Sequence, residues 1–423
     1  MKRPYFLLLF SVCFLVYAAR SLALDACVQC HSGLTENRLV LPIADMKEDV
    51  HSRAGFSCAD CHGGDSTASP HPESLCTRVV NPPQGFFGKP RPIQISKLCA
   101  RCHSSLEFMR QYSPSMPTDQ YDQFLTSGHG KGNQKGDTLD ASCVSCHGGH
   151  GIKPASDSRS PVHRSNISRT CGKCHSDPDY MKGYNLPTDQ VEKYEKSVHG
   201  LLLLSKDDPS TPTCNDCHGK HGSFPPAANA LSQSCDRCHL KSRNNSDLSP
   251  HRDAFIKLGL SQCDPCHRYH DTPSSSDEDV GLDSGVMCAD CHDEGTAAGQ
   301  GTIVMRGLIE DLKQRIVLAE ATAAKAEKGG YDISKTRFAL TEATNQLITA
   351  RTAVHLCDTT MLKEVTSKGI SATEKAIASA RVAIGNLAYR RRMIALFSLV
   401  VLLTAGALYL KMREIGTGKK NEK

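Results

Sequence analysis

One short pattern, Cys-x-x-Cys-His, occurs nine times between residues 27 and 292 and uses 18 of the 21 cysteines, which constrains the fold more than any other feature. The first cysteines of the motifs are Cys27, Cys58, Cys99, Cys143, Cys171, Cys214, Cys235, Cys263 and Cys288. The second cysteines are Cys30, Cys61, Cys102, Cys146, Cys174, Cys217, Cys238, Cys266 and Cys291. The motifs end at His31, His62, His103, His147, His175, His218, His239, His267 and His292.

The spacing within each motif has a chemical explanation. Two thiols three residues apart can form thioethers with the two vinyl groups at one edge of a porphyrin, and the next residue then places an imidazole under the iron. A zinc ribbon would not need a histidine after every cysteine pair, and a set of disulfides would not need the histidines at all. The pattern therefore predicts nine covalently attached haem c groups, with the motif histidines as iron ligands.

Ten further histidines are candidates for the second axial position. Nine haems with two imidazole ligands each require nine distal histidines, so ten candidates come close to a full set. The ten are His51, His71, His129, His150, His163, His199, His221, His251, His270 and His355. We expect those that recur in register to bind iron.

An internal repeat provides that register. Ser127-Gly128-His129-Gly130 and Ser197-Val198-His199-Gly200 each precede a motif, and the two histidines lie 70 residues apart. A shorter copy and a looser copy bring the total to four repeats, each with two motifs and two spare histidines. The first motif stands before them. His163 and His355 lie outside the repeats and compete for the ninth distal position.

Three motifs continue as His-x-x-His, with second histidines at His150, His221 and His270. Residues three apart on a helical turn point the same way. The second imidazole therefore cannot reach the opposite face of the haem that its neighbour holds. We expect it to bind the iron of a different haem, which would hold two porphyrins close together.

The composition agrees with a core made of cofactor. The chain has no tryptophan, 5% aromatic residues and a hydrophobic fraction of 39%, below the ~45–50% usual for soluble domains. Nine haems in a compact body of about 275 residues would have porphyrin edges about 10 Å apart or less, which permits electron tunnelling. Residues 24–300 are acidic overall, so no nucleic-acid partner is expected.

The two ends of the chain predict export and a membrane anchor. Residues 1–23 have the charged start, apolar run and small-residue cleavage site of a secretory signal peptide. After residue 303 the apolar spacing predicts helices up to Gly329, from 334 to 356, and from a capping box at Ser371 to about Lys411. Met393–Leu410 carries no charge and is long enough to span a lipid bilayer.

The expected domains follow from these boundaries. They are a signal peptide (1–23), a nine-haem domain (24–300), a helical stalk (301–390), a transmembrane helix (391–412) and a cytoplasmic tail (413–423).

The motifs resemble those of the multihaem c-type cytochrome superfamily, including tetrahaem cytochromes and the octahaem hydroxylamine-oxidoreductase-like proteins. The likeness covers residues 27–292. The helical extension resembles membrane-anchored cytochromes that exchange electrons with quinol-oxidising complexes. The resemblance implies a loop-rich fold of short helices around covalent haems, then a long-helix bundle and one C-terminal transmembrane helix. It also implies electron transfer in the periplasm. The signal peptide and the apolar C-terminal run predict a single-pass protein of the cytoplasmic (inner) membrane, with the haem domain on the periplasmic side.

Three functions remain open. The favoured one is a conduit that carries electrons between a membrane respiratory complex and periplasmic redox proteins, with most haems held by two histidines. The second is a reductase of nitrite, hydroxylamine or sulfur oxyanions with one open haem, although the sequence has no Cys-x-x-Cys-Lys motif. The third is a scaffold subunit of a larger respiratory complex. Cys76 and Cys357 have no role in this scheme. The sequence neither supports nor excludes a disulfide between them.

Overall fold

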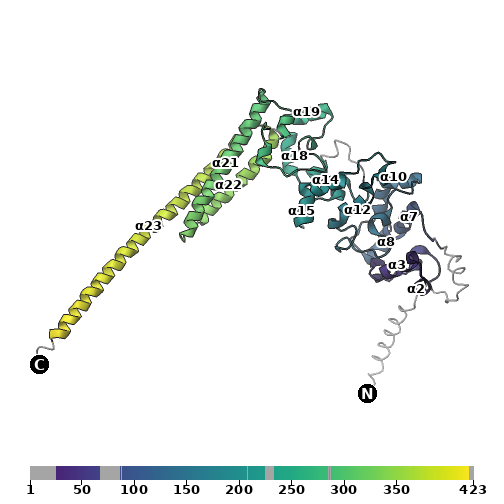
Figure 1. The fold of residues 1–423 in the computed structure, drawn as a ribbon, viewed down its shortest axis with the longest axis horizontal. Helices are drawn as coiled ribbons and strands as arrows, with labels where there is room; N and C mark the ends of the chain where they lie inside the picture. Colours follow the sequence, from purple (N-terminus) through teal and green to yellow (C-terminus); the bar gives the residue numbers. More distant parts are fainter. Residues whose placement is uncertain are drawn as a thin grey trace, which may run out of the picture. The chain divides into compact units, whose positions relative to one another are not determined.

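The computed structural model describes residues 25–66, 86, 88–206, 208–223, 233–283, 285 and 287–418 (Figure 1). The expected signal peptide, His71, Cys76 and residues 419–423 lie outside this part of the chain. Every regular element of the described residues is a helix, which confirms the predicted fold class. The contacts define two compact units: an N-terminal unit that runs to Ser234 and includes Arg268–Pro273, and a C-terminal unit of Cys235–His267 and the residues from Ser274 onward.

The N-terminal unit consists of short helices, of which the longest described, α7, has 12 residues. They are α2 Ala26–Ser32, α3 Asn37–Met46, α4 Val50–Arg53, α5 Cys58–His62, α7 Pro92–His103, α8 Leu106–Tyr112, α9 Gln120–Thr126, α10 Gly128–Lys135, α11 Cys143–His147, η1 Arg164–Asn166, α12 Ile167–His175, α13 Pro178–Met181, α14 Gln190–Lys196, α15 Val198–Lys206 and α16 Cys214–His218. Its buried apolar side chains are few and scattered: Ala26, Met109, Ile167, Met181, Tyr194 and Leu203. Side chains alone therefore supply little core.

A helical joint that occurs twice in this unit directs the helices that carry histidines. Ser127 lies between α9 and α10, where its hydroxyl donates to the Phe124 carbonyl (2.6 Å) and accepts from the Gly130 amide (2.9 Å). Ser197 makes the equivalent bonds between α14 and α15. A Cβ at Gly130 would lie 1.8 Å from the Phe124 carbonyl oxygen, so glycine lets the two helices meet this closely. The joint thereby fixes the direction of the helix that carries His129.

The C-terminal unit combines short helices with a bundle of three long ones. The short elements are α18 Leu240–Asp247, α19 Pro250–Leu258, α20 Asp264–His267, η2 Asp277–Asp279, η3 Met287–Asp290 and η4 Val354–Leu356. The bundle helices α21 (Ala297–Lys328), α22 (Ser334–Ala353) and α23 (Thr359–Gly418) pack side by side (Figure 1). Their core includes Met305, Ile309, Leu312, Ile316, Leu347 and Leu362. In the bundle, ordinary apolar side chains form a continuous core.

The third bundle helix begins earlier than the sequence predicts. The capping box at Ser371 predicts a start there, but α23 begins at Thr359. The cap is Asp358, whose carboxylate accepts hydrogen bonds from the Thr360 and Met361 amides (2.8 and 3.2 Å). At Ser371 the backbone is already helical, so its amides are used within the helix and need no capping side chain.

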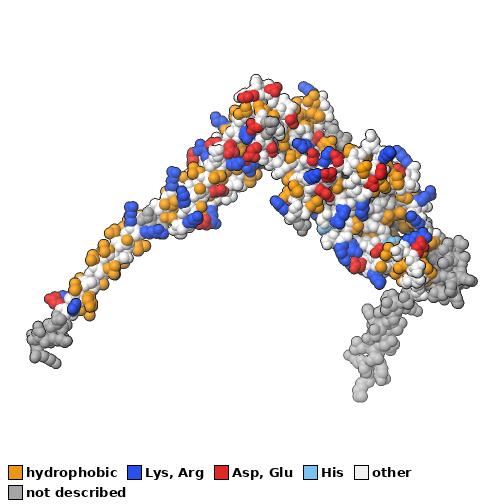
Figure 2. Space-filling view, in the orientation of Figure 1, with side chains coloured by type: hydrophobic (Ala, Val, Ile, Leu, Met, Phe, Trp, Pro, Cys, Tyr) orange, Lys and Arg blue, Asp and Glu red, His pale blue; other side chains and the backbone are white. Residues whose placement is uncertain are grey.

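The C-terminal part of α23 is apolar and exposed. Among the described residues, one helix, within Thr359–Glu414, is long and apolar enough to cross a membrane, and none of its most apolar stretch is buried. Figure 2 shows hydrophobic side chains along this part of the helix. Length and composition are the only support that the structure gives to a membrane span.

Candidate haem sites

The motif helices are short turns with a fixed beginning and end. In α5, α11 and α16 the residue before the first cysteine is a capping residue that forms a capping box: Ser57, Ser142 and Thr213. Each helix ends at the motif histidine, and the next residue is a glycine with positive φ: Gly63 (73°), Gly148 (85°) and Gly219 (89°). This geometry presents two thiols and one imidazole on a single rigid turn, as attachment of a porphyrin requires.

The end of the motif helix corrects the expectation for His-x-x-His. The spacing predicts both histidines on one helical turn, but α11 ends at His147, and Gly148 turns the backbone before His150. In the third copy Arg268 takes the place of the glycine, at a φ of 58°. The two imidazoles therefore leave the turn in different directions, and the second one meets a different partner.

In the described part of the chain, at least seven pairs of imidazole rings lie against each other within one or the other unit. In four pairs the histidine of an even-numbered motif meets a later histidine: His62–His150, His147–His221, His218–His270 and His267–His355, with ring centroids 6.0, 6.1, 5.8 and 6.0 Å apart and planes at 20°, 10°, 12° and 28°. In three pairs the histidine of an odd-numbered motif meets an earlier one: His103–His51, His175–His129 and His292–His251, at 6.0, 6.1 and 5.8 Å with planes at 89°, 61° and 39°. The four even-numbered motifs thus have nearly parallel rings, whereas the third, fifth and ninth motifs have more strongly crossed rings.

These pairs have the geometry of two axial ligands. Bonds from a metal to imidazole nitrogen are about 2.0–2.1 Å long, which places the centroids of two axial rings about 6 Å apart. The Nε2 atoms of His251 and His292 are 3.4 Å apart, somewhat closer than the about 4 Å that two such bonds span. Burial lowers the pKa of several of these imidazoles, including His129 and His147, and so favours the neutral form that binds iron. Paired thiols and facing imidazoles form the donor set that haem c requires.

Each early histidine is tied by the backbone to a later one. The early histidine of a repeat is the spare histidine that precedes its first motif, and the later one is the spare histidine that follows that motif. In three repeats, the residue just before the early histidine donates its backbone amide to a carbonyl of the next repeat. That carbonyl belongs to the residue two positions after the later histidine. The bonds are Val50 N to Ile152 O (2.9 Å), Gly128 N to Ser223 O (3.0 Å) and Val198 N to Thr272 O (3.0 Å). In the last repeat the residue before His251 is Pro250, which has no amide hydrogen, and the Sγ of Cys357 lies 3.2 Å from His251 Nδ1 instead. Cys357 lies two residues after His355, just as Ile152 lies two residues after His150. The turn after α22 therefore has the position that a His-x-x-His segment has in the other repeats.

Consecutive motifs also lie beside one another. The first cysteines of neighbouring motifs share hydrogen bonds in four cases: Cys27 with Cys58, Cys99 with Cys143, Cys171 with Cys214, and Cys235 with Cys263. The bond with Cys99 lowers the pKa of Cys143 to about 6. Burial, together with the nearby thiols Cys171 and Cys174, raises the pKa of Cys146 to about 11. Within each unit the motifs therefore follow one another in space in their sequence order.

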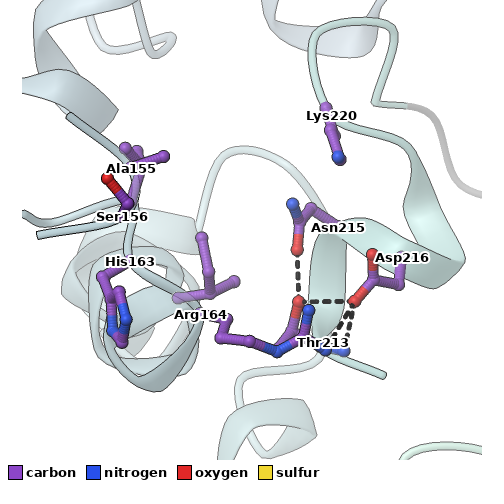
Figure 3. Close-up of a pocket in the computed structure, with 10 residues that line it drawn as sticks. Ala155, Ser156, His163, Arg164, Thr213, Asn215, Asp216 and Lys220 are labelled. Atoms are coloured by element: carbon purple, nitrogen blue, oxygen red, sulfur yellow. Dashed lines mark hydrogen bonds and ion pairs between the residues drawn. The ribbon is translucent and has the colours of Figure 1, made fainter. Parts of the chain in front are cut away.

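His163 lies in a different environment. It lines a cavity of about 300 Å³ together with Arg164, Thr213 and Asn215 (Figure 3). Its Nδ1 is 2.7 Å from the hydroxyl of Ser165. The seven imidazole pairs include His355 and do not include His163. His31, His199 and His239 are described but do not belong to these seven pairs, and His71 lies outside the described residues. The ligand roles of all these histidines, paired or not, stay predictions.

Sequence reasoning missed the residues two positions before the early histidines. In all four repeats this residue accepts a backbone amide at the start of the helix that carries the histidine. The four residues are Asp49, Ser127, Ser197 and Ser249, and all are buried. The signal was present in the sequence, because all four are residues that favour helix caps and stand at the same offset from a histidine.

Attachment turns, facing imidazoles and motifs that follow one another in space define a class of protein. These features are those of a multihaem c-type cytochrome, and the similarity to known proteins supports that class.

Comparisons with known proteins agree with this class. Residues 157–240 match the family described as cytochrome c7 and related cytochrome c. The chain is 24% identical over 234 residues to a protein named multiheme cytochrome MtrA from Shewanella baltica (strain OS185). That match covers 52% of this chain and 53% of the relative, so the chain spans about half the length of the curated relative that it matches. No solved structure matches the chain significantly.

Proposed function

We propose that the chain is a membrane-anchored relay in which nine haem c groups carry electrons on the periplasmic side of the cytoplasmic membrane. Bound haem supplies one-electron chemistry at iron. The motif cysteines hold each porphyrin by thioether bonds, and two imidazoles fix its iron. The order of the motifs carries the proposal, because within each unit neighbours in sequence are neighbours in space.

Histidines on both faces of each haem are part of the proposal. The seven imidazole pairs supply both axial ligands of seven irons. His355 takes the distal position for which it competes with His163, because its ring lies 6.0 Å from that of His267. The remaining distal ligands come from His71 and His199, which belong to the repeats. An iron with two imidazoles has no open position for a substrate, which favours a relay over a reductase.

The helix α23 serves as the anchor. It runs without interruption from the bundle through its apolar part, and exposed apolar side chains are stable there only when lipid covers them. With a signal peptide at 1–23, the haem domain (24–300) and stalk (301–390) are exported, residues 391–412 span the membrane and 413–423 stay in the cytoplasm. The electron donors and acceptors are a quinol-oxidising membrane complex and periplasmic redox proteins.

The haem content and ligation can be tested on the purified full-length protein. Mass spectrometry and haem quantification should give nine covalent haems per chain. Electron paramagnetic resonance (EPR) of the oxidised protein should show low-spin ferric haem. A substantial high-spin ferric signal would contradict two-histidine ligation and would favour a reductase with an open iron.

The anchor can be tested by truncation. A chain that ends at residue 390 should appear in the soluble periplasmic fraction with an unchanged haem spectrum. The full-length chain should require detergent for extraction. If the truncated chain stays with the membrane, another part of the protein must hold it there.

A further inference from the structure

The four repeats place a helix-capping residue two positions before the early histidine, and one of them differs in charge. Three repeats use serine, whereas the first uses Asp49. A serine hydroxyl would be sufficient for the cap, as Ser249 shows by accepting the His251 amide at 3.0 Å. A buried carboxylate at this position is costly unless its hydrogen bonds are satisfied, so its contacts call for an explanation.

Asp49 holds His51 through both the backbone and the ring. Its side chain is 1% exposed. Oδ1 accepts the His51 backbone amide at 2.8 Å and lies 3.0 Å from His51 Nδ1. Oδ2 accepts the Ile152 amide at 2.7 Å, from the segment that follows His150. The carboxylate is therefore fixed by three donors, one of which is the imidazole ring that faces His103.

Three other imidazole Nδ1 atoms lie beside neutral groups. His355 Nδ1 lies 3.1 Å from the Thr352 carbonyl, and His31 Nδ1 lies 3.3 Å from the Leu39 carbonyl. His251 Nδ1 lies 3.2 Å from the Cys357 sulfur. A carboxylate pulls the Nδ1 proton more strongly than a carbonyl or a thiol does, because the hydrogen bond is charge-assisted.

The effect on iron follows from ligand basicity. An imidazole that donates to a carboxylate becomes a stronger electron donor through Nε2, and the buried negative charge also favours the ferric over the ferrous state. Both effects lower the reduction potential of the haem that the imidazole holds.

We propose that Asp49 is a positioning residue that sets a low reduction potential at the haem attached to Cys99 and Cys102, through its hydrogen bond to the distal ligand His51. This inference rests on the proposed ligation of that iron by His51 and His103. Because Oδ2 binds the segment after His150, the same charge acts more weakly on the haem of the second motif. The third haem of the relay is then a low-potential step, because the residue that caps its distal ligand's helix is a carboxylate and not a serine.

The test is a redox titration of the full-length protein followed by EPR. The angle between two axial imidazole planes controls the anisotropy of a low-spin ferric signal, and the rings of His51 and His103 cross at 89°, the largest angle among the seven pairs. The signal of this haem is identified by its loss in a His51→Ala variant. Asp49→Ser converts the first repeat to the serine type and keeps a helix cap, and Asp49→Asn keeps the side-chain shape.

A matched control is available at Asp45. Asp45 is exposed, and like Asp49 it lies near the imidazole of His150. Burial lowers the pKa of His150, and the carboxylates of Asp45 and Asp49 both oppose this lowering. Asp45→Asn therefore removes the same charge from the same neighbourhood, while the Asp49–His51 hydrogen bond is retained.

The haem attached to Cys99 and Cys102 should respond to both Asp49→Ser and Asp49→Asn. At a fixed potential its ferric-to-ferrous ratio should fall at least tenfold, which corresponds to a rise in midpoint potential of about 59 mV for a one-electron couple. Asp45→Asn should change it less than threefold. If the signal exists but neither Asp49 variant moves its midpoint, or Asp45→Asn moves it equally, the inference is wrong and the relay stands. If the wild-type protein lacks low-spin signals altogether, the proposed ligation fails first.

Discussion

Different interactions stabilise the two regions of the molecule, residues 25–292 and the bundle α21–α23. The fully buried side chains of the first region are mainly small and polar, such as Asp49, Ser96, Ser127 and Ser197. Those of the bundle include Ile309, Leu312 and Leu362. The first group forms hydrogen bonds that fix loops and helix starts, whereas the second forms a hydrophobic core. The contrast indicates that covalent haem, and not side-chain packing, completes the interior of the first region.

The largest expected effect comes from removal of the haems. If residues 1–23 are the signal peptide that we propose, their deletion should keep the chain in the cytoplasm and prevent haem attachment. Residues 25–292 should then be unfolded and rapidly digested, because their short helices have little apolar surface to bury against one another. The bundle should remain helical, since its core consists of its own side chains.

Limited proteolysis with mass spectrometry and far-ultraviolet circular dichroism measure this difference. The protected fragment should begin near Ala297, the start of α21. Protection of residues 25–292 without haem would show that side chains suffice for their fold and would remove the contrast between the two regions.

The second prediction concerns the single histidine that the bundle end contributes. His355→Ala should leave the haem attached at Cys263 and Cys266 with one imidazole, and its iron should become high-spin, because His267 then has no facing ring. The bundle should stay folded, since His355 is not part of its apolar core. EPR of the oxidised protein should therefore gain a high-spin signal equivalent to one haem.

His163→Ala is the matched control. Its ring lines a polar cavity and is not part of the seven pairs, so the EPR spectrum should not change. If His163→Ala produces the high-spin signal and His355→Ala does not, the two histidines have been assigned in the wrong order.

The sequence predicts these two regions unequally well. The attachment turns and the bundle depend on neighbours within a few residues, so spacing and periodicity reveal them. The distal partners depend on contacts between distant segments: His251 and His292 are 41 residues apart, and Asp49 meets Ile152 across 103 residues. Periodicity contains no information about such contacts. The helical reading of His-x-x-His was wrong because it did not include the positive φ of Gly148, which ends the turn.

The bundle core offers a third prediction of moderate size. Leu312 is completely buried and packs against Gly369, where a Cβ would lie 2.8 Å from its methyl groups. Leu312→Ala should lower the free energy of unfolding of the bundle by about 2–5 kcal/mol, because the vacated space is not refilled. Haem absorption and EPR spectra should be unchanged. Thermal unfolding followed by circular dichroism measures the loss.

Leu318→Ala on the same helix is the control, since Leu318 is 57% exposed and its truncation should change stability by less than about 0.5 kcal/mol. A change of the haem spectrum in Leu312→Ala would mean that the bundle core also supports the haem sites, and the two regions would no longer be independent.

The smallest expected effect tests whether close backbone contacts replace a side-chain core in the haem region. A Cβ at Gly130 would lie 1.8 Å from the Phe124 carbonyl oxygen, whereas one at Gly128, in the same helix, meets nothing within 4 Å. Gly130→Ala should therefore force α9 and α10 apart and cost about 1–3 kcal/mol, as overpacking does. Gly128→Ala should be neutral or slightly stabilising, because alanine favours the helix.

The displaced helix α10 carries His129, so the effect should be visible at one haem. In Gly130→Ala the EPR signal that is lost in His129→Ala should shift or broaden, while the signals of the other haems stay in place. Gly128→Ala should leave all signals unchanged. If both glycine variants behave alike, the close approach of the two helices has no part in holding the imidazole of His129 against that of His175, and the order of this region must come from the haems alone.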